Sequence, residues 1–192
     1  FLVRLLGLMY IVNSISDHDL ESRARKSTIF NMIPFLAAFL FFVVSLLIAD
    51  GFAVEPETGL IYMEKFKYLH NFIDMPIVLA LFLSGTLLVL FGLYRMVFTI
   101  RKDPVWFSGA GTVLVVLSLF LLAGFNNTSF YPSSFDLQSS LTIRNASSSM
   151  FTLKTLMIVS FFIPVVLAYI WYTWKIINKK PIDKEEIETP SD

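Results

Sequence analysis

Four long runs of apolar residues constrain the fold of this chain more than any other feature. They cover residues 29–49, 76–98, 105–125 and 153–177. The first and third contain no charged residue, the second contains only Arg95 near its end, and the fourth has Lys154 and Lys175 at its edges. A helix needs about 20 apolar residues to cross the hydrocarbon core of a bilayer. Because lipid offers no partner to backbone polar groups, each run is predicted to be helical. The sequence therefore predicts an all-α fold, a polytopic bundle with four full transmembrane spans.

The composition of the 192-residue chain agrees with this class and excludes others. Hydrophobic residues make up 56% and charged residues 16%, whereas soluble domains carry about 25% charged residues. The formal net charge is zero, which argues against nucleic acid as a partner, because nucleic-acid binding needs a basic surface. The chain has no cysteine, so disulfides, thiolate metal sites and iron–sulfur clusters are excluded.

The two ends of the chain differ from the four runs. Residues 1–12 are apolar but too short to span a bilayer. They lack the basic region and the cleavage site of a secretory signal. We expect them to be the end of a fifth helix, and the chain to be the C-terminal part of a larger membrane protein. Residues 178–192 are charged and contain two prolines. We expect them to form a mobile cytoplasmic tail after a transmembrane region of residues 1–177.

Basic residues fall in three regions that share one side of the membrane if all four runs span it. These are Arg23, Arg25 and Lys26 after the first segment, Arg101 and Lys102 between the second and third spans, and Lys175, Lys179, Lys180 and Lys184 near the C-terminus. Cytoplasmic loops are enriched in such residues. The C-terminus is therefore predicted to be cytoplasmic, and loops 50–75 and 126–152 to face outward.

Small residues and one proline stand out inside the spans. Residues 84–86 and 108–111 form two small-residue patches, which favour close helix packing. A substrate path is the alternative interpretation of these patches. Pro164 has no N–H to donate to the Ser160 carbonyl, so a kink is predicted in the last span.

Ionisable groups are few at membrane depth. Asp74 precedes Met-Pro, which is typical of a helix N-cap with proline in the first turn. Arg95 and Lys175 are expected to extend toward the cytoplasmic face. The depth of Arg4 is not defined by the sequence, because its helix is short.

No haem, metal or catalytic ligand set is predicted in this chain. Both histidines, His18 and His70, are predicted to lie in loops. A haem between helices needs His, Met or Cys at depth. Met96 and Met157 are available, but helical methionines are usually packing residues. We therefore expect catalytic, cofactor-binding and metal-binding residues to be absent from the chain.

The polar segment 125–154 is longer than a simple helix connection requires. It is rich in Ser, Thr and Asn, and it is interrupted by Phe130, Tyr131, Phe135, Leu141 and Ile143. These apolar side chains predict that the segment folds back and packs. We expect a structural cap at the outer membrane surface, in which the Ser-Leu-Thr and Ala-Ser-Ser elements fix how the chain returns into the membrane at Thr152.

Four motifs in order carry a family resemblance. They are YPSS at 131–134, SLTIRNASSS at 140–149, TLKTLMIVS at 152–160 and IPVVLAYIWYTWK at 163–175. This order resembles the C-terminus of subunit II of the cytochrome bd-type ubiquinol oxidases. DLESRARKST at 19–28 is similar to the basic cytoplasmic link of that family. One departure is Ile-Arg-Asn between Thr142 and Ala146. We expect Arg144 to pair with Asp136 or with a partner subunit, or to be solvated.

The resemblance implies a two-subunit core in a bacterial cytoplasmic membrane, with nine membrane helices in each subunit. It implies that subunit I holds haems b558, b595 and d and oxidises quinol, that dioxygen is reduced to water, and that proton motive force results. The expected partners are subunit I and membrane lipid, with a structural quinone and a small accessory subunit as further candidates. The alternatives are a fragment of a secondary transporter and a non-catalytic membrane scaffold.

Overall fold

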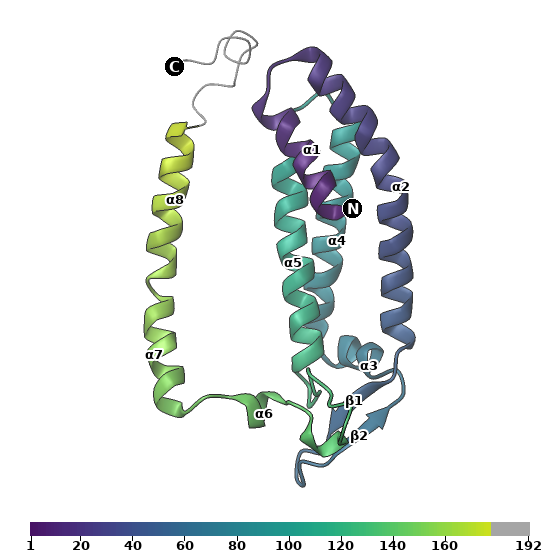
Figure 1. Cartoon of the computed structure of the whole chain (residues 1–192), viewed down its shortest axis with the longest axis vertical. Coiled ribbons are helices and arrows are strands. Elements are labelled where there is room, and N and C mark those ends of the chain that lie inside the picture. Colours follow the sequence, from purple (N-terminus) through teal and green to yellow (C-terminus); the bar gives the residue numbers. More distant parts are fainter. Residues whose placement is uncertain (178–192) are drawn as a thin grey trace.

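The computed structural model describes residues 1–177, and the predicted tail 178–192 lies outside the described residues. Four helical segments are long and apolar enough to cross a membrane (Figure 1). They are α2 (His18–Ile48), α4 (Pro76–Phe98), α5 (Pro104–Gly124) and the consecutive pair α7 (Met150–Ser160) and α8 (Ile163–Ile177). The prediction of an all-α, polytopic transmembrane fold with four full spans is therefore confirmed.

The first apolar segment forms α1 (Leu2–Ser14), which packs against α2 and α5. At about 1.5 Å per residue, this helix is about 20 Å long, which is shorter than a hydrocarbon core of about 30 Å. Helix α2 starts before the predicted span at residue 29, because the Asp17 carboxylate caps it. Its Oδ1 accepts hydrogen bonds from the N–H groups of Asp19 and Leu20 at 2.8 and 3.1 Å. The placement of His18 in a loop was wrong, since His18 is the first residue of α2.

A β-hairpin follows α2, and sequence patterns did not indicate it. Strand β1 (Gly51–Val54) pairs antiparallel with β2 (Ile61–Glu64), with Gly51 opposite Glu64. The hairpin lies below the membrane helices in Figure 1, next to residues 125–149. The backbone of Thr128 forms a bridge with Ala53. We call this end of the molecule, made of residues 49–75 and 125–149, the strand end.

A short helix, α3 (Lys67–Asp74), leads from the hairpin to α4. His70 therefore lies in a helix, which corrects the prediction that it lies in a loop. The predicted N-cap role of Asp74 was also wrong, because Asp74 is the last residue of α3. Met75 occupies the cap position of α4 without a side-chain hydrogen bond, and Pro76 lies in the first turn as expected.

Helices α4 and α5 make the closest contact in the structure. A Cβ atom added at Gly111 would lie 2.5 Å from the Gly85 carbonyl oxygen and 2.7 Å from the Val89 nitrogen. The buried Ser108 hydroxyl donates a hydrogen bond to the Val89 carbonyl at 3.3 Å. Packing is therefore the role of Gly85, Ser108 and Gly111, as the sequence predicted. Gly109 differs, because an added Cβ there would meet no atom within 4 Å.

Two clusters of buried apolar side chains hold α1, α2, α3, α4 and α5 together. One consists of Leu5, Met9, Val12, Ala24, Val89, Leu93 and Met96. The other consists of Phe72, Val78, Phe82, Val115 and Leu122, and lies toward the strand end. We call α1, α2, α4 and α5 the bundle. Its other end, made of residues 13–26 and 99–103, carries the predicted basic residues, and we call it the basic end.

The fourth span is a broken helix that stands apart from the bundle (Figure 1). Helix α7 stops at Ser160, and the N–H groups of Phe161 and Phe162 donate to the carbonyls of Ile158 and Val159 at 3.2 and 3.0 Å. The predicted kink before Pro164 is confirmed as a break, because proline has no N–H for the Ser160 carbonyl. None of residues 150–177 is buried. We call α7 and α8 the arm.

Candidate functional site

Polar side chains gather at the two ends of the bundle rather than at its centre. Within residues 1–177, no group of three or more His, Asp or Glu side chains is arranged to hold a metal ion. Met96 is fully buried in the apolar cluster with Leu5 and Met9, and Met157 is exposed on the arm. Sequence patterns did not single out the polar contacts described below, because most of them join residues that are far apart in the chain.

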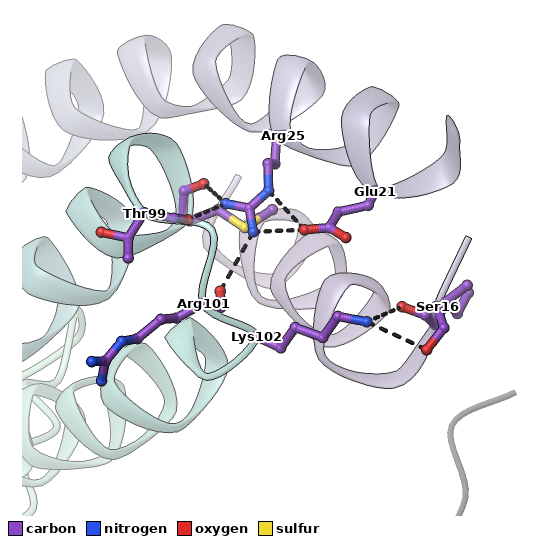
Figure 2. A network of polar contacts seen from close by, with 8 residues as sticks. Ser16, Glu21, Arg25, Thr99, Arg101 and Lys102 are labelled. Atoms are coloured by element: carbon purple, nitrogen blue, oxygen red, sulfur yellow. Dashed lines mark hydrogen bonds and ion pairs between the residues drawn. The ribbon is translucent and has the colours of Figure 1, made fainter. Parts of the chain in front are cut away.

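Arg25 forms the centre of a polar network at the basic end (Figure 2). Its guanidinium pairs with Glu21 one turn earlier in α2, with an Nη2–Oε1 distance of 2.8 Å. The same group donates hydrogen bonds to the carbonyls of Met96 and Thr99, the latter at 2.6 Å, and to Arg101 at 3.4 Å. The last carbonyls of a helix have no partner within the helix. Arg25 of α2 therefore caps the C-terminus of α4 with a positive charge.

Lys102 makes a second connection at the basic end (Figure 2). Its Nζ donates to the Ile15 carbonyl at 3.2 Å and to the Ser16 hydroxyl at 3.4 Å. The link between α4 and α5 is thus attached to the turn between α1 and α2. Two of the basic regions that the charge pattern assigned to a common side therefore lie together in the structure.

Arg95 extends from α4 toward the basic end, as the sequence predicted, but it is buried there rather than exposed. Its Nη2 is 2.9 Å from Oδ1 of Asp103, and that oxygen has no well-aligned hydrogen bond among the described residues. The guanidinium also lies over the rings of Phe91 and Phe107, at 5.6 and 5.0 Å from their centroids. A positive group held between two rings and a carboxylate is a structural tie between α4 and the start of α5.

Asn71 is a fully buried polar residue at the strand end. Its Nδ2 donates to the Leu122 carbonyl at 3.0 Å, in the last turn of α5, and to the Thr128 hydroxyl at 2.8 Å. The Asn126 amide donates to Oδ1 of Asn71 and to the Asp74 carboxylate, both at 3.0 Å. Asp74 thus serves the loop after α5 rather than the start of α4.

The polar segment 125–154 folds back on the hairpin. The Gln138 side chain, in a short 3₁₀ helix (Leu137–Ser139), makes two hydrogen bonds with the backbone of Ile61 in β2, both at 2.9 Å. Thr128, Ser129 and Ser140 are buried. The prediction that this segment folds back and packs is therefore confirmed at these residues.

The return of this segment into the membrane uses two helix caps. Thr142 and Asn145 form a reciprocal capping box at the start of α6 (Ile143–Ala146). Ser149 then caps α7, and its hydroxyl accepts a hydrogen bond from the Thr152 N–H at 3.3 Å. The cap that begins α7 is thus Ser149, which directly follows the Ala-Ser-Ser element at residues 146–148. Arg144 does not pair with Asp136 in the structure, because it donates to the Pro56 carbonyl in the hairpin turn at 3.0 Å.

Glu64 joins the hairpin to α3 by electrostatic contacts. Its carboxylate lies 2.8 Å from Nδ1 of His70 and 3.0 Å from Nζ of Lys67. The hydrogen bond with His70, followed by the contacts with Lys67, holds the pKa of Glu64 below its ordinary value and outweighs the opposite effect of partial burial. Burial raises the pKa of the neighbouring Tyr68 hydroxyl.

Among the cavities between the helices, two are relevant to function. An apolar cavity of about 180 Å³ lies between α2, α4 and α5 near the start of α1, and Phe35, Phe39 and Val115 contribute to its wall. A larger cavity of about 680 Å³ lies between α1, α5 and α8, and tryptophans from α5 and α8 contribute to its wall. Neither cavity contains an ionisable cluster of a kind that supports acid–base or metal chemistry.

Comparison with protein-family models supplies the functional context for this geometry. Residues 1–177 match the family described as cytochrome bd terminal oxidase subunit II. The match covers the bundle, the strand end and the arm. A search among curated proteins found no match.

Proposed function

Because the chain belongs to the cytochrome bd terminal oxidase subunit II family, we propose that it supports the haem-bearing subunit I of a quinol:oxygen oxidoreductase. In this proposal subunit I holds haems b558, b595 and d, quinol is oxidised at the outer face, and dioxygen is reduced to water with protons from the cytoplasm. The complex lies in a bacterial cytoplasmic membrane and generates proton motive force. The strand end faces outward, and the basic end and the C-terminus face the cytoplasm.

The exposure of the arm is the observation that carries the supporting role. Large apolar side chains cover α7 and α8, and not one of them is buried within residues 1–177. Such a surface needs lipid or another protein chain around it. The Ser149 cap sets where the arm starts, as is expected of a surface that must meet a partner in one position.

Arg4 adds an independent reason to expect a protein partner. It is exposed on α1 and has no hydrogen bond or ion pair within the described part of the chain. At 1.5 Å per residue it lies about 15 Å from the Ser14 end of α1, and Figure 1 places the start of α1 about halfway along α4 and α5. An arginine at this depth is costly in lipid and is usually paired inside a protein assembly. We propose that it meets an acceptor on subunit I.

Purification of the complete oxidase tests the assignment. The intact protein should co-purify with a partner that shows reduced haem d absorption, and the complex should consume oxygen when quinol is supplied. Isolation as a stable haem-free homo-oligomer without a partner would refute the proposal. Solute uptake by proteoliposomes in the absence of oxidase activity would instead support the secondary-transporter alternative.

Substitution of Arg4 tests the interface. Arg4→Leu should lower the amount of assembled complex at least about tenfold, because removing one partner of a buried pair costs several kcal/mol. Arg4→Lys should retain part of the assembly. Arg23→Leu is the matched control, since Arg23 is exposed at the basic end. Equal assembly of Arg4→Leu and the wild type would show that Arg4 has no partner on subunit I.

A further inference from the structure

The 680 Å³ cavity between α1, α5 and α8 has the lining of a lipid site rather than of a helix contact. Its wall contains Trp106 at the start of α5, Trp171 and Trp174 on α8, and Tyr10 on α1. These are all three tryptophans of the chain. Tyr10 and Trp174 are in contact, with ring centroids 6.3 Å apart. Tryptophan and tyrosine concentrate at the level of lipid headgroups, so the cavity mouth lies at the membrane interface.

Small residues of α5 form part of the cavity wall. Gly109 and Ala110 form part of it, and a Cβ atom added at Gly109 would meet no atom within 4 Å. Gly111, two residues further along, is in close contact with α4, because a Cβ atom added there would lie 2.5 Å from the Gly85 carbonyl oxygen. The small residues on this face of α5 therefore do not serve helix packing. They widen an apolar channel whose volume falls in the range of about 300–1,000 Å³ that ligand sites occupy.

One positive charge stands at the mouth of this channel. Lys175 lines the cavity, and its Nζ lies 5.1 Å from the centroid of the Trp171 ring. No acidic side chain within residues 1–177 pairs with it. Arg101 and Lys102 precede the start of α5 in sequence, and Asp103 beside them is already paired with Arg95. A basic pocket between membrane helices complements an anionic lipid headgroup.

We propose that this cavity binds one anionic phospholipid, with its phosphate at Lys175 among the tryptophans and an acyl chain along Gly109, Ala110 and Val113. The lipid would join α8 to the bundle at the basic end, next to the contact between the Tyr10 and Trp174 rings. The inference goes beyond the oxidase role, because it concerns the cohesion of this subunit and needs no electron-transfer step.

Photo-crosslinking with defined lipids tests the proposal on the purified oxidase complex in nanodiscs. One preparation contains phosphatidylglycerol with a photoreactive acyl chain, and the other contains phosphatidylcholine with the same chain. Labelled peptides are mapped by mass spectrometry. Residues 106–113 and 171–175 should be labelled about fivefold more by phosphatidylglycerol, the factor expected from one basic residue near a headgroup.

Two variants and two controls assign the effect to the cavity. Lys175→Gln should reduce the labelling ratio to near one, and Lys175→Arg should preserve it. Gly109→Leu should fill the channel and reduce labelling by both lipids. Gly7→Leu is the matched control, because an added Cβ at Gly7 also meets no atom within 4 Å and Gly7 does not line the cavity.

Three outcomes would overturn the proposal. Equal labelling of the wild type by both lipids would show nonspecific annular contact. Absence of labelling by either lipid would show that a protein segment occupies the cavity. Recovery of a quinone crosslinked to the same peptides, with both lipids excluded, would assign the site to that molecule. If Gly109→Leu does not assemble, the phosphatidylglycerol-to-phosphatidylcholine labelling ratio of Lys175→Gln still tests the proposal. Lys175 is exposed at the end of α8, so its substitution should not prevent folding.

Discussion

The bundle and the arm are built from equally apolar sequence, yet they obtain their stability in different ways. In the bundle, α4 and α5 approach until the Gly85 and Gly111 backbones nearly touch, and Arg25 and Asn71 satisfy helix-end carbonyls across 51 or more residues of sequence. In the arm, no residue is buried and the helix is broken at Phe161 and Phe162. Apolar character therefore makes both parts membrane-spanning, but only small residues and crossing polar contacts make one of them self-supporting.

The largest effect is expected where the two bundle helices touch. Gly111→Ala should lower the free energy of unfolding by about 3 kcal/mol, the upper end for overpacking, because the new Cβ would lie 2.5 Å from the backbone oxygen of Gly85. The apparent melting temperature of the purified complex measures this loss. Gly109→Ala is the matched control in the same helix and should cause no loss, because it adds a methyl group to open space. Equal destabilisation by the two substitutions would show that α4 and α5 do not pack through Gly111.

A smaller effect is expected at the root of the arm. Replacing Ser147, Ser148 and Ser149 together with Leu should impair assembly with subunit I, because the Ser149 cap that sets the start of α7 is lost. The loss of such a cap amounts to about 1 kcal/mol. Haem content per complex and quinol oxidase activity are the readouts.

The contribution of the cap can be separated from that of the loop surface. Ser147→Leu with Ser148→Leu leaves Ser149 in place and should assemble better than the triple variant. Ser149→Thr should retain the cap. Normal haem content and activity in the triple variant would mean that the arm is positioned by its partner alone.

The smallest effect is expected from pH at the strand end. Contacts with His70 and Lys67 lower the pKa of Glu64 in the folded protein, so their stabilisation is complete above the unfolded pKa of about 4.5. It is lost as pH falls through the lower folded pKa. We expect a change of less than about 1 kcal/mol, as is usual for partly exposed pairs. Thermal unfolding between pH 6 and about pH 3 would show it, and Glu64→Gln should remove that part of the pH dependence. An unchanged profile in Glu64→Gln would exclude Glu64 as its source.

The sequence indicated the membrane elements because their signal is local. Runs of apolar residues located four spans, and Pro164 located the break in the last one. The short elements at the strand end were missed. The hairpin strands have only four residues each, which is too short for a clear pattern. The Asp-Met-Pro pattern at Asp74 is typical of an N-cap, but Asp74 is instead the last residue of α3.

The polar contacts at the ends of the bundle were beyond the reach of local patterns. The position of Arg95 at the end of an apolar run predicted its direction, but not that Asp103 and two phenylalanine rings enclose it. Arg25 belongs to a basic stretch that indicated topology and gave no sign of a capping role. A cap supplied by another helix depends on how the helices are placed, and no spacing along the chain encodes it.

By itself, the sequence determined that the chain is a polytopic membrane protein, how many times it spans, and the family to which it is similar. These properties follow from apolar length and from the order of motifs, because the bilayer imposes helical structure on any run that is long enough. Tertiary structure alone decided which small residues pack against another helix and which line a cavity. It also decided which charged side chains form buried contacts between helices. Gly109 and Gly111 show the reason, because they are two residues apart in one helix but face different neighbours. The placement of α4 makes Gly111 a packing residue, and the placement of α8 makes Gly109 part of a cavity wall.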